Sequence, residues 1–335
     1  MYRARSLFRP IRAFFFDRRG DVYYNRSRAV VRNGRRHEEN IMAYERLTKG
    51  ELPVLAVCYD FDKTLSPDNM QAQGYIQSVD CDVDEFWRES NRLADENGMD
   101  MNLAYMYTMC KKAKGKFYPT LEKLLEYGSR IRLYEGVEEW FPRVNAYGRA
   151  HGVQVEHYIL SSGLREMIEG TSVAGEFKKI YASAFMFDDY GVPVWPAQAI
   201  NYTNKTQFLF RIQKGCLDIN DHKGVNAYVP PEEIRVPFRN IVYLGDSETD
   251  VPCMKLVTSN GGHAVGVYDP VTRDTSLVRA MMRHRRIRYY APADYREGSA
   301  LDTLIKLIVD RTAANERLEE IHDDDVREAA LRDDE

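Results

Sequence analysis

Two aspartates with one residue between them follow a short apolar run early in the chain. Asp60 and Asp62 come directly after residues 54–59 (VLAVCY). Because residues i and i+2 of a strand point to the same side, we expect the two carboxylates to lie close together. Carboxylates that close repel each other unless a cation or a shared proton compensates. The pair therefore predicts a metal site.

The elements that must position this pair are strands of a parallel sheet. The apolar run 54–59 is typical of a strand buried on both faces, as in sheets covered by helices. In open α/β sheets, ligands bind in the crevice outside the carboxyl ends of the strands. A second buried strand, predicted over residues 240–244, is followed by Gly245, Asp246 and Asp250. The sequence therefore predicts an α/β fold with acids at two strand ends.

Two weaker candidates belong to the same pattern. A strand over residues 153–160 ends in Ser161-Ser162-Gly163, where hydroxyls and backbone N–H groups suit an anionic phosphate oxygen, or where a serine simply caps the next helix. Lys205 precedes an apolar-periodic helix and could equally be an ordinary exposed lysine. Capping and solvation explain each feature alone, but not the acids, hydroxyl and lysine together.

The first 41 residues differ in composition from the rest. They contain eleven Arg and no Lys against four acids, a net charge of +7, whereas the whole chain carries −4. Residues 1–41 are interpreted as a disordered basic arm, an organellar transit peptide, or translated upstream sequence with the true start at Met42. We favour the last because the composition changes abruptly at Met42. The acidic remainder argues against a nucleic-acid partner.

The other segments are assigned by periodicity. We expect residues 42–70 and 133–314 to form the core domain, residues 71–132 a helical insertion, and residues 315–335 an acidic frayed helix or tail. Four methionines of the insertion (Met99, Met101, Met106 and Met109) are interpreted as plain core. Amphipathic helices are predicted over residues 137–150 and 301–309, and a hairpin over residues 181–195 with its turn at 188–191.

Cysteine usage and hydropathy bear on the compartment. The five cysteines lie far apart with no C-x-x-C pair, which argues against a disulfide framework or a thiolate zinc site. The apolar runs are too short for a membrane span. We expect a cytoplasmic protein with no membrane partner.

The four strand-end features, in this order, resemble the haloacid dehalogenase (HAD) superfamily over residues 54–309. The motif D-x-D-x-T matches residues 60–64, the strand-end hydroxyl matches Ser161, the lysine matches Lys205, and G-D-x-x-x-D matches Gly245, Asp246 and Asp250. The insertion resembles the small cap of the phosphoserine-phosphatase-like branch. The resemblance implies a Rossmann-like parallel sheet core with a helical cap inserted after the first strand.

The resemblance also implies a role for each residue. Asp60 is the nucleophile, Asp62 the general acid and base, Ser161 a phosphoryl ligand, and Lys205 the partner of Asp60. The implied Mg²⁺ site consists of Asp60, Asp62 through its backbone carbonyl, Asp246 and Asp250. Further substrate contacts are assigned to Thr64, Ser162, Gly163 and Arg165, although for Arg165 we favour an i, i+4 pair with Glu169.

The expected activity is magnesium-dependent hydrolysis of a small phosphorylated metabolite through an aspartyl-phosphate. The presence of Asp62 favours phosphate ester hydrolysis over dehalogenase or phosphonatase chemistry. Lys63 departs from the small residue that often follows the second aspartate in phosphoserine phosphatases, which weakens phosphoserine as the substrate. Two alternatives remain: a phosphotransferase or mutase that uses the same intermediate, and a catalytically silent binding protein with this fold.

Overall fold

The structure is a computed structural model that describes residues 15–16, 22–23 and 44–333. The chain divides into two units, Met1–Ala43 and Tyr44–Glu335. In the first unit, strands β1 (Phe15–Phe16) and β2 (Val22–Tyr23) pair antiparallel. The other residues of the 1–41 segment, and with them the prediction made for it, lie outside the described residues.

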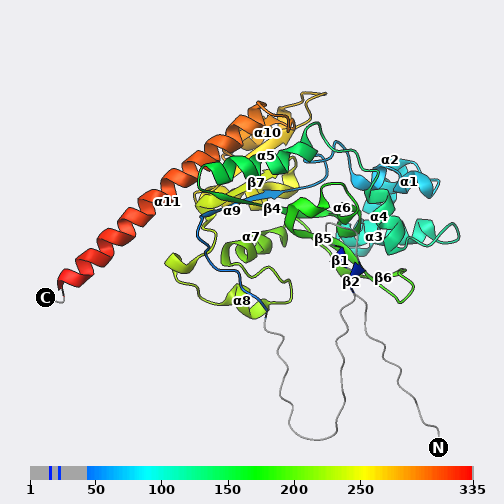
Figure 1. The fold of residues 1–335 in the computed structure, drawn as a ribbon. Coiled ribbons are helices and arrows are strands. Elements are labelled where there is room, and N and C mark those ends of the chain that lie inside the picture. Colours follow the sequence, from blue (N-terminus) through cyan, green and yellow to red (C-terminus); the bar gives the residue numbers. More distant parts are fainter. Residues whose placement is uncertain (1–14, 17–21, 24–43, 334–335) are drawn as a thin grey trace, which may run out of the picture. The chain divides into compact units, whose positions relative to one another are not determined.

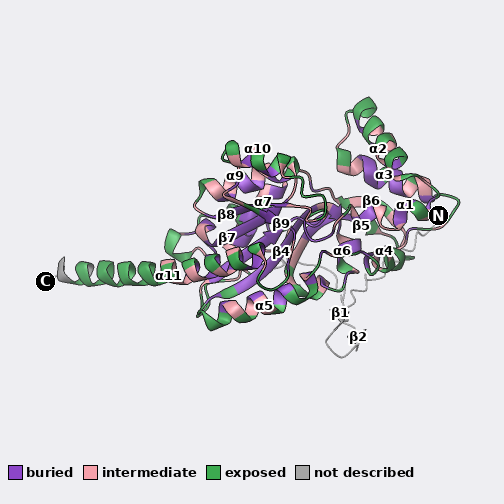
Figure 2. Cartoon of the chain, turned by 90° about the horizontal axis from the view of Figure 1, so that it is seen from above, coloured by how far each residue is buried: buried purple, intermediate pink, exposed green. Residues whose placement is uncertain are grey.

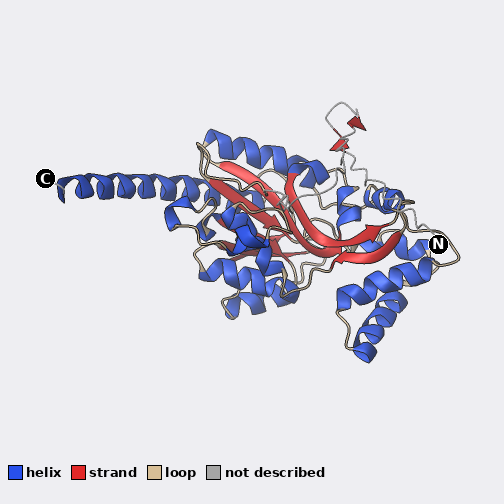
Figure 3. Ribbon diagram, turned by 90° about the horizontal axis from the view of Figure 1, so that it is seen from below, coloured by secondary structure: helices blue, strands red, loops and turns tan. Residues whose placement is uncertain are grey.

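The second unit is built on a seven-stranded sheet with the order β6-β5-β4-β3-β7-β8-β9 (Figure 3). All neighbouring strands run parallel except β6, which pairs antiparallel with β5. The strands are β3 (Val54–Tyr59), β4 (Gln154–Leu164), β5 (Phe177–Phe187), β6 (Pro193–Gln198), β7 (Ile241–Gly245), β8 (His263–Tyr268) and β9 (Tyr289–Pro292). This confirms the predicted α/β fold, and β3, which precedes Asp60, lies at its centre.

Helices cover both faces of the sheet (Figure 2). Alternate residues of β3 belong to different cores: Leu55 and Val57 pack with α5 (Val137–Ala150) and the start of α11 (Ala300–Asp333). Ala56 and Cys58 pack on the other side, with α7 (Lys205–Lys214), α9 (Val251–Ser259) and α10 (Ser276–Arg283). Every residue of β3 is buried, as its uninterrupted apolar sequence predicts.

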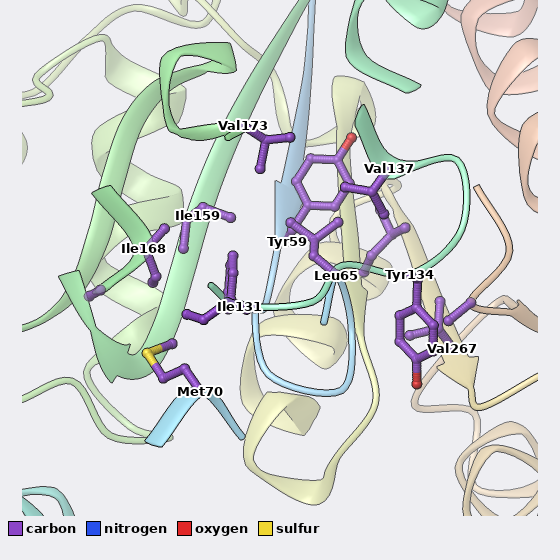
Figure 4. Packing of buried hydrophobic residues seen from close by; sticks show 14 of the residues in the cluster. Tyr59, Leu65, Met70, Ile131, Tyr134, Val137, Ile159, Ile168, Val173 and Val267 are labelled. Atoms are coloured by element: carbon purple, nitrogen blue, oxygen red, sulfur yellow. The ribbon is translucent and has the colours of Figure 1, made fainter. Parts of the chain in front are cut away.

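The segment of residues 71–132, here called the cap, is helical as expected. Its helices are α1 (Tyr75–Ser78), α2 (Val83–Asn97), α3 (Met101–Ala113) and α4 (Leu121–Gly128), and they gather at one end of the sheet (Figure 1). The chain leaves and re-enters the core at neighbouring points, because the Tyr134 N–H donates to the Leu65 carbonyl oxygen at 2.8 Å. Figure 4 shows the Leu65 and Tyr134 side chains among the buried hydrophobic residues of the core.

The C-terminal helix is longer than predicted. Instead of a helix that ends near residue 309, α11 continues to Asp333. Its first turns are buried through residues such as Leu301 and Ile305, whereas from residue 319 to residue 329 every described side chain is exposed. Two short helices, α6 (Arg165–Glu169) and α8 (His222–Asn226), complete the main elements. Among the described residues, none of the helices combines the length and apolar character that a membrane span needs.

Candidate active site

The ends of β3, β4 and β7 meet the cap around a cavity of about 430 Å³. From the core, the lining includes Asp60, Asp62, Ser161, Ser162, Gly163 and Asp246. From the cap, it includes residues 99–102, which span the turn between α2 and α3 and the first two residues of α3. Two residues define this turn. Gly98 adopts a left-handed conformation (φ 57°) that ends α2. The Asp100 side chain caps the N-terminus of α3.

Lys205 is the first residue of α7 and is fully buried. Its Nζ lies 3.1 Å from Asp60 Oδ1 and 2.8 Å from Asp250 Oδ1. Burial alone would lower the pKa of this amine, but the two carboxylates outweigh it and raise the pKa, so the lysine stays charged. The alternative of an ordinary exposed lysine is therefore wrong.

The two aspartates after β3 differ in environment. Asp60 is 7% exposed, and burial raises its pKa to about 6 against the opposing charge of Lys205. Asp62 Oδ1 accepts a hydrogen bond from the Met70 N–H at 2.8 Å, and burial, followed by the charge of Asp60, raises the pKa of Asp62 to about 8. At neutral pH Asp60 is therefore mostly ionised while Asp62 retains its proton, which suits a nucleophile next to a general acid.

Three carboxylates, those of Asp60, Asp246 and Asp250, have oxygens within 4.8 Å of one another. Burial and the two neighbouring carboxylates raise the pKa of Asp246, which indicates a site that favours a cation. All the donors are carboxylate oxygens, the ligands that Mg²⁺ prefers. The Asp62 side chain is not part of this group.

Asp250 is already held by protein donors. Its Oδ1 accepts from Lys205 and from the Tyr243 hydroxyl (2.8 Å), and its Oδ2 accepts from the backbone N–H (3.2 Å) and hydroxyl (3.0 Å) of Ser247. Each carboxylate oxygen has two lone-pair sites, so these four bonds use them all. Asp250 therefore fits a supporting role, and Asp60 and Asp246 offer the freer oxygens.

Residues 161–163 lie within β4, near its carboxyl end, because the strand continues to Leu164. Neither serine caps α6, whose N-cap is Leu164. The Gly163 N–H donates to Ser161 Oγ at 3.0 Å. A Cβ on Gly163 would overlap the Met70 methyl and lie 3.1 Å from Asp62 Oδ2, so a larger residue here would displace the Met70 side chain and crowd Asp62.

Two predicted substrate residues lie elsewhere. Thr64 is fully buried, and its hydroxyl donates to Asp246 Oδ1 at 3.4 Å, so it contacts the candidate metal carboxylate and not the cavity. Arg165 lines a separate cavity of about 300 Å³, because β4 ends just before it and its side chain turns back along α6. There its guanidinium lies 3.6 Å from both Glu166 and Glu169, the arrangement that the i, i+4 spacing favoured.

The cavity also contains residues that the sequence did not single out. Met99 and Met101 line it and are not core residues, whereas Met106 and Met109 are buried as predicted. The remaining additions are Lys63, Asn69, Asp100, Asn102, Asn201, Tyr202, Ser247 and Thr249. The break between α2 and α3, marked by a glycine and a capping aspartate, was the available signal for the cap residues, because pockets form at such turns and not along packed helix faces.

Comparisons with known proteins agree with this arrangement. A family model described as haloacid dehalogenase-like hydrolase matches residues 57–255. A protein of Borreliella burgdorferi described as uncharacterized is 26% identical over 274 residues, which cover 74% of this chain and 94% of that protein.

Solved structures are more distant in sequence. A HAD family hydrolase from Salmonella enterica serovar Typhi is 17% identical with a TM-score of 0.49, and the match covers 78% of this chain and 74% of that one. A probable phosphoserine phosphatase from Vibrio cholerae is 12% identical with a TM-score of 0.48, covering 79% and 69% respectively.

Proposed function

This chain belongs to the haloacid dehalogenase-like hydrolase family, and from that premise we propose that it is a magnesium-dependent phosphatase acting on a small phosphorylated metabolite. The observation that carries the proposal is the convergence of three strand ends on one cavity, with Lys205 bridging Asp60 and Asp250 and with Ser161 on the same wall. Residues 42–70 and 133–314 act as the core, residues 71–132 as the cap, and residues 315–335 as an acidic C-terminal extension.

In the first step, a carboxylate oxygen of Asp60 attacks phosphorus and the bond from phosphorus to the leaving oxygen breaks. Lys205 holds the other Asp60 oxygen and balances its charge. Asp62 gives its proton to the leaving oxygen, which becomes a neutral hydroxyl. The product of this step is an aspartyl-phosphate on Asp60.

In the second step, Asp62 has become a carboxylate and takes a proton from an attacking water molecule. The water oxygen bonds to phosphorus, the bond from phosphorus to the Asp60 oxygen breaks, and phosphate is released. Ser161 donates to a phosphoryl oxygen in both steps. At the end of the second step Asp60 is again a carboxylate and Asp62 is again protonated.

The carboxylates of Asp60 and Asp246 and the backbone carbonyl of Asp62 would hold Mg²⁺. When bound, the ion supplies positive charge that offsets the negative charge of the phosphoryl oxygens. Asp250 supports the site through Lys205 and through the turn after β7.

The walls around the cavity favour a small substrate. A volume of about 430 Å³ is at the lower end of the range for ligand pockets, roughly 300–1,000 Å³. The cap contributes Met99, Asp100, Met101 and Asn102, and the core loop contributes Asn201 and Tyr202. Asp100 is the one charged side chain of this set, and its carboxylate already caps α3 and accepts from Asn201. We therefore expect the part of the substrate that enters this side of the cavity to carry no further negative charge.

The test is magnesium-dependent hydrolysis of para-nitrophenyl phosphate. We expect phosphate release that stops when EDTA removes the metal, and a fall in kcat of about 10²–10⁴-fold in Asp62→Asn. The matched control is Asp189→Asn, the same change at an exposed position in the β5–β6 turn. Mass spectrometry of acid-quenched enzyme should find one phosphoryl group on the peptide that contains Asp60.

Several results would contradict the proposal. A well-folded wild-type protein without activity on this substrate or on a panel of phosphorylated metabolites would favour the binding-protein alternative. Full activity in Asp62→Asn would reject the assigned acid and base. Transfer of the phosphoryl group to an added alcohol in preference to water would identify a phosphotransferase.

A further inference from the structure

A tyrosine of the cap reaches the wall that carries Ser161. The Tyr105 hydroxyl, on α3, donates a hydrogen bond to the Ser162 carbonyl oxygen at 2.7 Å. Tyr105 is 4% exposed, and its ring packs edge-on against Trp87 of α2 with 6.0 Å between the ring centroids. Burial raises the pKa of its phenol, so the hydroxyl remains protonated and acts as a donor.

The peptide group that accepts this bond also donates one. The Ser162 carbonyl and the Gly163 N–H belong to the same peptide unit, and the Gly163 N–H donates to Ser161 Oγ at 3.0 Å. The three groups therefore form a series from the cap tyrosine through one peptide to the serine hydroxyl. Hydrogen bonds in series polarise one another, so the tyrosine strengthens the N–H as a donor and fixes the peptide plane.

This arrangement restricts the direction of the Ser161 hydroxyl. A serine hydroxyl has one hydrogen to donate and two lone pairs that accept. The Gly163 N–H occupies one lone pair, so the O–H bond must point away from it, and Ser161 lines the cavity. We infer that Tyr105 is a positioning residue that orients the Ser161 hydroxyl as a donor to the bound phosphoryl group. The inference rests on the proposed function for the role of Ser161.

The cap position is thereby linked to phosphate recognition. Two further bonds hold the start of α3 on the core: Asn102 Nδ2 donates to the Ile200 carbonyl oxygen at 2.8 Å, and Asn201 Nδ2 donates to Asp100 Oδ2 at 2.9 Å. A cap that is displaced from this position would break the bond between Tyr105 and Ser162, leaving the serine hydroxyl less well oriented. Phosphate contacts are therefore strongest when the cap is seated.

The test is a double-mutant cycle of Tyr105→Phe and Ser161→Ala, measured on para-nitrophenyl phosphate. We expect Tyr105→Phe to lower kcat about tenfold with KM changed less than about twofold, because it weakens one oriented hydrogen bond. In the Ser161→Ala background the same change should alter kcat less than about twofold. Tyr107→Phe is the matched control, since Tyr107 lies on the same helix and is 52% exposed.

A purely structural role gives a different result. Removing the hydroxyl leaves the partly buried Ser162 carbonyl without this donor, which lowers stability in both backgrounds alike. An equal loss of kcat with and without Ser161, or no loss at all, would overturn the inference. If Tyr105→Phe does not fold, a ring-fluorinated tyrosine at position 105 keeps the shape and changes the donor strength. Its effect on kcat must then depend on Ser161.

Calorimetric titration with inorganic phosphate in the presence of Mg²⁺ repeats the cycle without turnover. We expect weaker phosphate binding in Tyr105→Phe only when Ser161 is present. A protein that binds phosphate but does not hydrolyse esters would refute the proposed function while the binding cycle still decides the role of Tyr105. Absence of both binding and hydrolysis would refute both.

Discussion

Protonation of one buried histidine should govern part of the acid sensitivity of this fold. His157 lies in β4 and is 2% exposed. Its Nδ1 lies 2.9 Å from the Tyr59 hydroxyl and its Nε2 lies 3.1 Å from Asn145 Oδ1, which suits a neutral ring that accepts at one nitrogen and donates at the other. Burial lowers its pKa to about 3, although the charge of Glu156, itself paired with Arg235 at 2.7 Å, acts in the opposite direction.

The magnitude follows from proton linkage. In the unfolded chain a histidine has a pKa of about 6.5. Below that pH the unfolded chain binds a proton that the native state does not, so this stability is complete above about pH 6.5 and is lost as the pH falls toward about 3. At pH 5 the loss is about 1.5 pH units at about 1.36 kcal/mol each, or about 2 kcal/mol.

The assay is urea unfolding at pH 7 and pH 5 for the wild type, His157→Gln and His151→Gln. Glutamine does not titrate, so His157→Gln should lose about 2 kcal/mol less than the wild type between the two pH values, whatever its stability at pH 7. His151→Gln is the control because it makes the same substitution at a histidine whose side chain is 42% exposed. Equal pH dependence in all three proteins would refute the reasoning.

Two further substitutions test the packing of the site. Lys205→Met should lower the free energy of unfolding by about 3–5 kcal/mol, because it leaves two buried aspartates without their shared cation; a loss below about 1 kcal/mol in urea unfolding would contradict the ion-pair geometry. Gly163→Ala should cost about 1–3 kcal/mol, because the new methyl overlaps the buried Met70 side chain. The same methyl crowds Asp62, so kcat should fall together with stability, and normal kinetics in this variant would count against the observed approach.

The sequence predicted the parts of the molecule that depend on local pattern. Uninterrupted apolar runs identified β3 and β7, and the position of charged residues at their ends identified Asp60 and Asp246 before any geometry was known. The helix over residues 137–150 was predicted with the bounds that the structure shows. These signals are strong because the burial of a strand and the periodicity of a helix depend on the residue types within one short stretch of sequence.

Contacts between distant segments could not be predicted in the same way. The bond from Tyr105 to Ser162 joins residues 57 positions apart, and it depends on how the cap packs on the core. The direction of the Arg165 side chain depends on the residue at which β4 ends. A shift of one residue at that end would point the side chain to a different side of α6. The length of α11 was underestimated because its second half is exposed and polar, so it carries no apolar periodicity.

The hydrogen bond between Leu65 and Tyr134 means that the cap and the sheet can change independently of each other. Because the chain leaves the core and returns to it at neighbouring points, the intervening residues form a loop with fixed ends. The entropy lost on closing such a loop depends only weakly on its length. We therefore expect insertions or exchanges there to preserve the register that β3 has against β4 and β7. The positions of Asp60 and Asp246 are thus set by the sheet, whereas the cap can change in length and sequence.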